Sequence, residues 1–124
     1  MRRYASLRGR REFALVLRRG KAVTVNGLNV FAFAHTKTGS PARVGIVVKK
    51  QVGNAVERNL LRRRCKAILD QHPMDGERYW FVIQCKPGAA QIPFAALRAE
   101  LLRALTASKA RAARAPLPLK QTQR

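Results

Sequence analysis

The sequence predicts an α+β protein with a single mixed four-stranded sheet and helices packed on the sheet. Runs of β-branched and aromatic residues, typical of strands, alternate with segments of helical apolar spacing. The chain has 124 residues, which is the size of one domain. Its apolar fraction of 47% is sufficient for a core. The predicted element order is α-β-β-β-α-β-α.

The first half of the chain predicts one helix and three strands. Gly20 is a plausible C′ residue after the helix, and Asn26-Gly27 is a favoured hairpin dipeptide between two strands. The expected segments are a basic irregular start over 1–9, a helix over 10–19, strands over 23–25, 28–34 and 43–48, and a loop over 36–41.

The second half predicts two helices around one strand. Asn54 is a good N-cap residue, and Pro93 fits the first turn of a helix. The strand between the helices is almost continuously apolar, so we expect it inside the sheet and buried on both faces. The expected segments are a helix from Asn54 to about Gln71, a break over 72–76, a strand over 79–85 and a helix over 94–108.

The C-terminal segment has a different composition. From Lys109 the chain is rich in Ala, Arg, Lys and Pro. We therefore expect a single domain over 1–108 and a basic, mobile tail over 109–124. Truncation after Ser108 is expected to leave the fold intact and to weaken partner binding only modestly.

The charge indicates a polyanionic partner. The chain carries 26 Lys and Arg against 6 Asp and Glu, a net charge of +20. A folded domain this basic most often binds nucleic acid. Its apolar runs fall short of the ~18 residues that span a bilayer, and its start lacks a secretory pattern. We expect a cytoplasmic protein without a membrane partner, in which Cys65 and Cys85 are reduced, buried thiols.

The most informative segment is Lys49–Lys66, which contains seven basic residues and one acid. On a helical wheel Leu61, Cys65, Ile68 and Leu69 share one side and should face the sheet. Most of the basic residues fall on an adjoining arc, where like charges repel unless a polyanion neutralises them. A solvated helix face usually mixes signs, whereas Glu57 is the only acid between Lys49 and Asp70.

This segment resembles the protein subunit of bacterial ribonuclease P. In that family a strand ending in Lys-Lys is followed by a Gly-Asn turn and a basic helix. The matching residues are Val44–Lys50 for the strand, Val52–Val56 for the turn, and Arg58-Asn59, Arg62-Arg63 and Lys66 for the helix. The segment Leu7–Gly20, with Glu12-Phe13 and Val16, resembles the family's first helix, and Phe81–Pro87 resembles its last strand. Leu60 stands where the family usually has Arg, with Arg64 one turn further along.

The resemblance implies a protein that assists a catalytic RNA. In this family the RNA uses Mg²⁺ to remove the 5′ leader of precursor tRNA. The protein binds the catalytic RNA through the basic helix and the single-stranded leader through a cleft. A left-handed β-α-β crossover is implied as well, against the general right-handed rule. The chain is expected to be a monomer when free, with no cofactor of its own.

The resemblance assigns residues to both surfaces. Phe31 and Phe33 share one face of their strand, and ordinary core packing is as good an explanation for each cleft residue. Leu17 stands where the family often has Phe. The expected leader cleft is Phe13, Leu17, Phe31 and Phe33. The expected RNA-binding residues are Lys49, Lys50, Asn54, Arg58, Asn59, Arg62, Arg63 and Lys66.

Other functions fit the sequence less well. A protein nuclease needs clustered carboxylates or a His pair, but the six acids are scattered, and His35 and His72 are far apart. We therefore expect no catalytic residue and no metal ligand in the chain. A DNA-binding helix would need a helix-turn-helix partner. The main alternative is a ribosomal or other structural RNA-binding protein without a role in cleavage.

Overall fold

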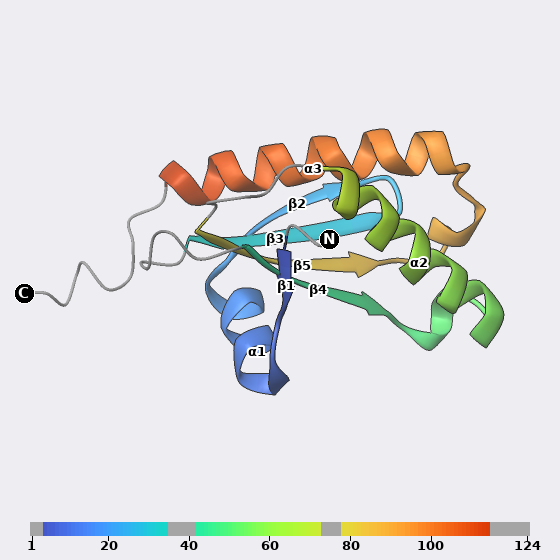
Figure 1. The fold of residues 1–124 in the computed structure, drawn as a ribbon, viewed down its shortest axis with the longest axis horizontal. Helices are drawn as coiled ribbons and strands as arrows, with labels where there is room; N and C mark the ends of the chain where they lie inside the picture. Colours follow the sequence, from blue (N-terminus) through green and yellow to red (C-terminus); the bar gives the residue numbers. More distant parts are fainter. Residues whose placement is uncertain (1–3, 35–41, 73–77, 115–124) are drawn as a thin grey trace, which may run out of the picture.

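One mixed sheet of five strands, in the order β1-β4-β5-β3-β2, organises the protein (Figure 1). The structure is a computed structural model that describes residues 4–34, 42–72 and 78–114. The elements are β1 (Tyr4–Ser6), α1 (Gly9–Arg19), β2 (Lys21–Val25), β3 (Leu28–Ala34), β4 (Ala42–Val48), η1 (Lys50–Val52), α2 (Ala55–Gln71), β5 (Tyr79–Cys85), η2 (Ala89–Gln91) and α3 (Phe94–Arg114).

The middle strand is β5, as its apolar sequence predicts. It pairs in parallel with β4 and antiparallel with β3. Phe81, Val82 and Ile83 are each at most 1% exposed, so the strand is buried on both faces. The helix α2 joins the parallel neighbours β4 and β5, which confirms a β-α-β crossover. The hand of this crossover stays a prediction.

The structure adds a strand to the four that the sequence predicts. Residues 4–6, expected to be irregular, form β1 at the edge of the sheet and pair in parallel with residues 42–44 of β4. The N–H of Leu7 then donates to the carbonyl oxygen of Val44 at 3.2 Å. A three-residue edge strand is too short to show an alternating pattern. Its extended conformation depends on pairing with the edge of β4.

The two faces of the sheet carry different packing. Along β3 the burial alternates with period two, so Leu28, Val30, Ala32 and Ala34 face one side. On that side α2 and α3 complete the main core with residues such as Leu61, Ile68, Leu97 and Leu101. On the other side α1 covers part of the sheet. The smaller cluster there contains Leu7, Val16 and Val82, with Phe13, Phe31, Phe33, Val47 and Trp80 packed around them.

A reciprocal cap fixes the start of α2. The Asn54 carboxamide oxygen accepts from the N–H of Glu57 at 2.8 Å, and the N–H of Asn54 donates to the Glu57 carboxylate at 2.9 Å. This capping box satisfies two donors that a helix start otherwise leaves unpaired. The predicted N-cap is confirmed. The carboxylate of Glu57, the acid within the basic segment, is therefore engaged in this cap.

Two glycines serve different purposes near α1 and the hairpin. Gly27 has a φ of +80°, which the predicted Asn-Gly turn requires. Gly20 follows α1, but with a φ of −75° it is extended and not the left-handed C′ residue that the sequence suggests. A Cβ at Gly20 would lie 2.4 Å from the carbonyl oxygen of Val16, so this position needs glycine for space.

The last helix is longer than expected. It runs to Arg114, so residues 109–114 belong to the folded domain and not to a tail. Ala112 is only 4% exposed, and Arg111 donates to the carbonyl oxygen of Ala22 in β2 at 2.8 Å. Alanine has the highest helix propensity, and Ala112 continues the buried face one turn beyond Ser108. Residues 115–124, and the loop and break expected over 36–41 and 73–76, lie outside the described residues.

This packing adds a stability cost to the expected effect of truncation. A chain ending at Ser108 should lose about 1–2 kcal/mol of unfolding free energy, because it loses one buried methyl group and the anchor on β2. A chain ending at Arg114 keeps both of these groups and is the control. Urea unfolding of the three proteins measures this. Equal midpoints for the Ser108 and Arg114 chains would show that the last turns of α3 add nothing.

The two cysteines are free and buried, as the sequence predicts. Cys65 on α2 and Cys85 on β5 are 0% and 2% exposed. A hydrogen bond with the Cys85 side chain, together with burial, raises the pKa of the Cys65 thiol far above its usual value. Cys65 should therefore stay protonated at neutral pH.

A protonated, buried thiol is a poor nucleophile. We expect Cys65 to react with a chromogenic disulfide reagent at least about a hundredfold more slowly in the native protein than in urea. A Cys85→Ala variant isolates the Cys65 signal. Fast labelling of that variant under native conditions, at an unchanged melting temperature, would contradict the expected burial.

Candidate nucleic-acid interface

Helix α2 presents its basic residues away from the core, as the helical wheel predicts. Leu61, Cys65, Ile68 and Leu69 are buried against the sheet. The other side of the helix carries the predicted RNA-binding residues. Of these, Asn54, Asn59, Arg63 and Lys66 are exposed, as are Lys49 and Lys50 before the helix, while Arg58 and Arg62 are half-buried.

No carboxylate of the described residues forms an ion pair with a basic residue of α2. Carboxylates there pair with Arg43 and Arg103. The guanidinium of Arg58 donates to the carbonyl oxygen of Gly53 at 3.2 Å, which ties it to the turn before the helix. The like charges along this helix repel one another, and a bound polyanion would relieve that repulsion. The helix is therefore a strong binding site for a polyanion.

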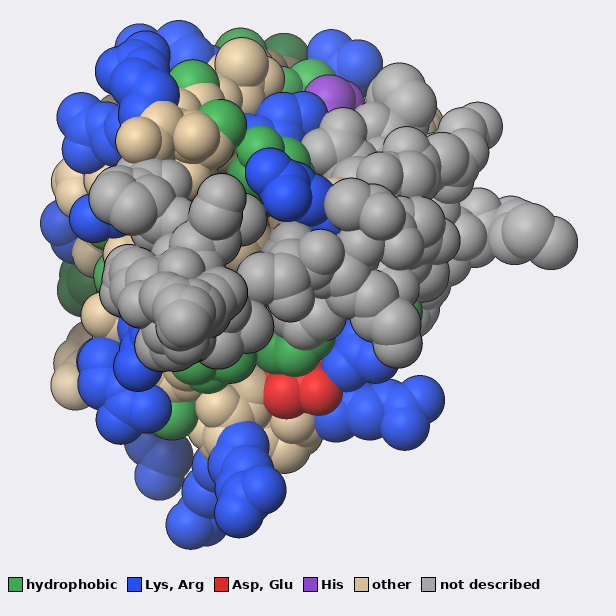
Figure 2. Space-filling model, turned by 90° about the vertical axis from the view of Figure 1, so that its left-hand side faces the viewer, with side chains coloured by type: hydrophobic (Ala, Val, Ile, Leu, Met, Phe, Trp, Pro, Cys, Tyr) green, Lys and Arg blue, Asp and Glu red, His purple; other side chains and the backbone are tan. Residues whose placement is uncertain are grey.

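Basic charge is not confined to α2. Figure 2 shows the side of the molecule that lies to the left in Figure 1, where Lys and Arg side chains lie around much of the outline and a small acidic area borders some of them. Exposed arginines of α1, among them Arg10, Arg18 and Arg19, add to this distribution. Charge alone does not locate an RNA site on such a protein. The location of the site has to be inferred from the shape of the surface and from the types of side chain that lie beside the cations.

A hollow of about 190 Å³ lies between α1 and α2, where the edge of β4 becomes uncovered. Because β1 ends at Ser6, nothing pairs with β4 beyond Val44 on that side among the described residues. We call this hollow the edge groove; it is lined by Ser6, Leu7, Phe13, Val44, Gly45, Ile46, Arg62 and Lys66. It is smaller than the ~300 Å³ of typical enclosed ligand pockets, which suits a chain that crosses it.

The edge groove brings an aromatic ring beside two cations. Phe13 comes from α1, whereas Arg62 and Lys66 are one turn apart on α2. A Cβ at Gly45 would lie 2.3 Å from the Phe13 ring, so glycine in β4 gives the ring its place. An aromatic face can stack on an unpaired base while cations hold the adjacent phosphates.

The structure brings three of the four predicted cleft residues together. Phe13, Phe31 and Phe33 all pack into the α1-side cluster, and Phe13 also lines the edge groove. Leu17 is 39% exposed and lies outside both the cluster and the groove lining. The half-buried rings of Phe31 and Phe33 contribute to core packing, which is the alternative that the sequence left open. Their contact with RNA stays a prediction.

Sequence reasoning missed two side chains at this face. Trp80 on β5 lies 6.3 Å from the Phe33 ring, and the Arg43 guanidinium lies 5.2 Å from the Trp80 ring centre. Arg43 also forms an ion pair with Glu12 of α1 at 2.6 Å. The sequence pattern that could have identified Trp80 is the two-residue period of β5, which places it on the same face as Val82. Ser6 and Leu7 were missed because residues 1–9 were expected to be irregular.

Leu60, which stands where the family usually has Arg, lies at the surface of α2. It is 43% exposed, and Val56, one turn before it, is 77% exposed. Val56 and Leu60 lie on a third side of α2, and neither residue belongs to the core or lines the edge groove. Arg64, one turn after Leu60, is half-buried.

Two absences hold for residues 4–34, 42–72 and 78–114. No group of three or more His, Cys, Asp or Glu side chains there is arranged to hold a metal ion. No helix there is long and apolar enough to cross a membrane.

A basic helix beside an aromatic groove, on a small α+β domain, defines a class of RNA-binding protein. Comparison with known proteins agrees. The family model described as Ribonuclease P matches residues 1–109. The chain belongs to this family.

Two curated relatives illustrate the similarity. The chain is 36% identical over 111 residues to the ribonuclease P protein component of Gluconacetobacter diazotrophicus, covering 86% of this chain and 93% of the relative. It is 34% identical over 99 residues to that of Clavibacter michiganensis, covering 77% and 84%.

Solved structures show the same fold. The RNase P protein of Thermotoga maritima has a TM-score of 0.68 and 26% identity, covering 79% of this chain and 92% of that one. A Staphylococcus aureus RNase P protein mutant has a TM-score of 0.73 over 84% and 87% of the two chains. At 20% identity the latter comparison concerns the fold alone.

The stacking role of the Phe13 ring can be tested with a substitution that keeps an apolar side chain in the groove. Phe13→Leu keeps an apolar side chain but removes the stacking face, which contributes about 1–3 kcal/mol per stacked base. Its affinity for a single-stranded RNA oligomer should fall by that amount in a fluorescence anisotropy titration. Phe94→Leu, at the exposed start of α3, is the matched control and should bind like the parent. An equal, small loss in both variants would remove Phe13 from the RNA site.

Proposed function

We propose that this chain is the protein subunit of a ribonuclease P, in which it assists a catalytic RNA in removing the 5′ leader from precursor tRNA. The observation that carries the proposal is the edge groove, which joins Phe13 of α1 to Arg62 and Lys66 of α2. A groove with an aromatic face and cations suits a single strand, and the exposed outer side of α2 suits structured RNA.

Each group of residues has a distinct task in this proposal. Lys49, Lys50, Arg58 and Arg63 neutralise phosphates of the catalytic RNA. Their contacts supply affinity that depends on salt and carries no sequence information. Asn54 acts mainly through the helix start that it caps, and Asn59 offers a carboxamide beside the arginines. Arg62 and Lys66 hold leader phosphates while Phe13 stacks on a base.

The protein's contribution is positioning, and the chemistry belongs to the RNA. Bound Mg²⁺ would activate water and stabilise charge at the scissile phosphate. We place those ions on the catalytic RNA and assign none to this chain. A cationic subunit lowers the repulsion between catalytic RNA and substrate, so less Mg²⁺ is needed for assembly. We further propose that the free subunit is a monomer and works in the cytoplasm, where precursor tRNA is its substrate.

The alternative, a structural RNA-binding protein without a role in cleavage, is not favoured. Composition and size would fit it equally well. The family match over residues 1–109 includes the basic helix and the elements that form the edge groove. Relatives matched over most of their length have the same description.

Cleavage of a precursor tRNA at low Mg²⁺ by a bacterial catalytic RNA tests the proposal. The protein should restore correct 5′ cleavage, and Arg62→Ala with Arg63→Ala should lower the rescued rate at least about tenfold, because two phosphate contacts are lost. The control replaces Arg98 and Arg114, two exposed arginines of α3, with Ala and removes the same charge.

Each outcome separates the hypotheses. Rescue by the control but not by the α2 variant places the effect on this helix. RNA binding without rescue by the parent protein would favour the structural alternative. Equal loss in both double variants would mean that only net charge matters.

A further inference from the structure

Two thiols meet between the basic helix α2 and the central strand β5. Cys65 of α2 and Cys85 of β5 both belong to the main core, where they are 0% and 2% exposed. Their side chains are hydrogen-bonded to each other across the two elements. The proposed function uses neither thiol. Two sulfur atoms in contact on different elements are the arrangement from which a disulfide forms.

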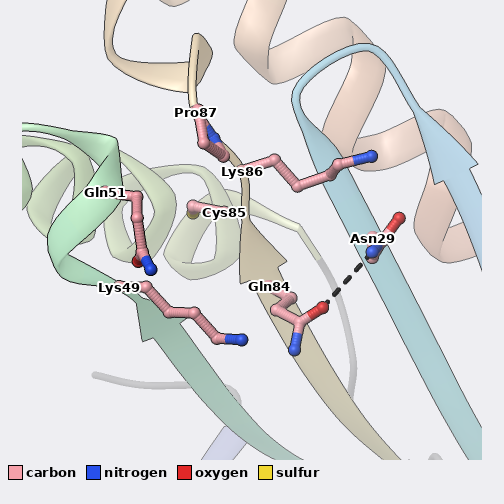
Figure 3. A pocket seen from close by; sticks show the side chains of 7 residues that line it. All are labelled: Asn29, Lys49, Gln51, Gln84, Cys85, Lys86 and Pro87. Carbon is pink, nitrogen blue, oxygen red and sulfur yellow. Dashed lines mark hydrogen bonds between the residues drawn. The ribbon is translucent and has the colours of Figure 1, made fainter.

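The surroundings of the two sulfur atoms differ. Cys85 is the last residue of β5 and lines a hollow of about 360 Å³ where β4 and β5 end (Figure 3). In that view its side chain lies on the side of β5 that faces Gln51. Cys65 lies within α2 and does not line this hollow. A small molecule therefore reaches Cys85 after local opening at a strand end, whereas access to Cys65 requires α2 to leave the sheet.

Positive charge favours the thiolate form of Cys85. Lys49 and Lys86 line the same hollow, and no Asp or Glu of the described residues contributes to the lining. Arg62 lies on α2, one turn before Cys65. The hydrogen bond from Cys65, followed by the charge of Arg62, lowers the pKa of the Cys85 thiol in spite of its burial. Because the thiolate is the reactive form, Cys85 is the nucleophile of the pair and Cys65 is its protonated partner.

We propose that Cys65 and Cys85 are a modification site at which a hydroperoxide converts the two thiols to a disulfide between α2 and β5. With hydrogen peroxide, the Cys85 thiolate attacks one oxygen, the O–O bond breaks and hydroxide leaves, which gives a sulfenic acid at Cys85. The Cys65 sulfur then displaces the hydroxyl group as water, and the S–S bond forms. In total the two thiols lose two electrons and two protons, and the peroxide is reduced to two molecules of water.

The disulfide would join the basic helix to the middle of the sheet. Arg62, which lies one turn from Cys65, also lines the edge groove. An RNA phosphate that pairs with Arg62 would offset the charge that favours the Cys85 thiolate, so bound RNA should protect the pair from oxidation. This protection rests on the proposed function, whereas the disulfide itself does not. Other thiols would reverse the bond by exchange, as is usual for redox-sensing disulfides inside cells.

Intact-mass spectrometry of the full chain tests the site, after peroxide under native conditions and N-ethylmaleimide in urea. The parent should lose about two mass units, take up no N-ethylmaleimide and recover both thiols in dithiothreitol. Cys65→Ala should retain oxygen on Cys85, while Cys85→Ala should stay reduced because Cys65 is buried and protonated. A parent that keeps both thiols, gains only oxygen or links two copies would overturn the proposal. Equal oxidation of the two variants would overturn the assignment of Cys85 as nucleophile.

The rate of disulfide formation tests the role of Arg62. Arg62→Gln should slow the reaction of the free protein at least about threefold, because the Cys85 thiolate loses a neighbouring cation. Arg98→Gln, at an exposed arginine of α3, is the matched control and should react at the parent rate. Equal rates in the two variants would overturn the role of Arg62.

A single-stranded RNA oligomer should slow disulfide formation in the parent and have less effect on Arg62→Gln. An oligomer that binds the parent without slowing the reaction would overturn the protection by RNA. A parent that forms the disulfide but gives no cleavage rescue would keep this site and reject the ribonuclease P role. Rescue by a parent that forms no disulfide would do the reverse, so the two failures are distinguishable.

Discussion

The central position of β5 is the constraint on which the rest of the structure depends. A strand that is buried on both faces needs a layer on each side. Here α2 and α3 cover one face completely, while the 11 residues of α1 cover only part of the other. The uncovered part is available for ligands, and the edge groove borders it. The same pairing holds β4 beside β5, so that α2 starts close to the edge of the sheet.

The short β1 has a comparable effect at the edge. If it continued beside β4, the backbone of Ile46 would be paired and the edge groove would be filled. Its end at Ser6 lets the chain turn into α1, which brings Phe13 onto Gly45. The groove thus exists because β1 ends at Ser6 and because Gly45 of the neighbouring strand β4 has no side chain. Charge from α2 then lies on one wall and an aromatic ring on the other.

Much of this architecture follows from local sequence, but the site does so only in part. The cap at Asn54, the hairpin at Gly27 and the buried strand β5 have local signals, which the structure confirms. The strand β1 and the last turns of α3 do not, because their conformations depend on β4 and β2. The wheel of α2 predicts which residues face out, but not that Arg62 and Lys66 line the same groove as Phe13. That groove lies between α1 and α2 and is a property of the tertiary fold.

The edge groove is suited to a single strand of any sequence. An aromatic face accepts any base, and cations accept any phosphate. Phe13 comes from α1, which packs on one face of the sheet, whereas Arg62 and Lys66 come from α2, which packs on the other. The edge of β4 is where side chains of both layers can reach one ligand. The groove therefore depends on the same sheet that separates the two layers.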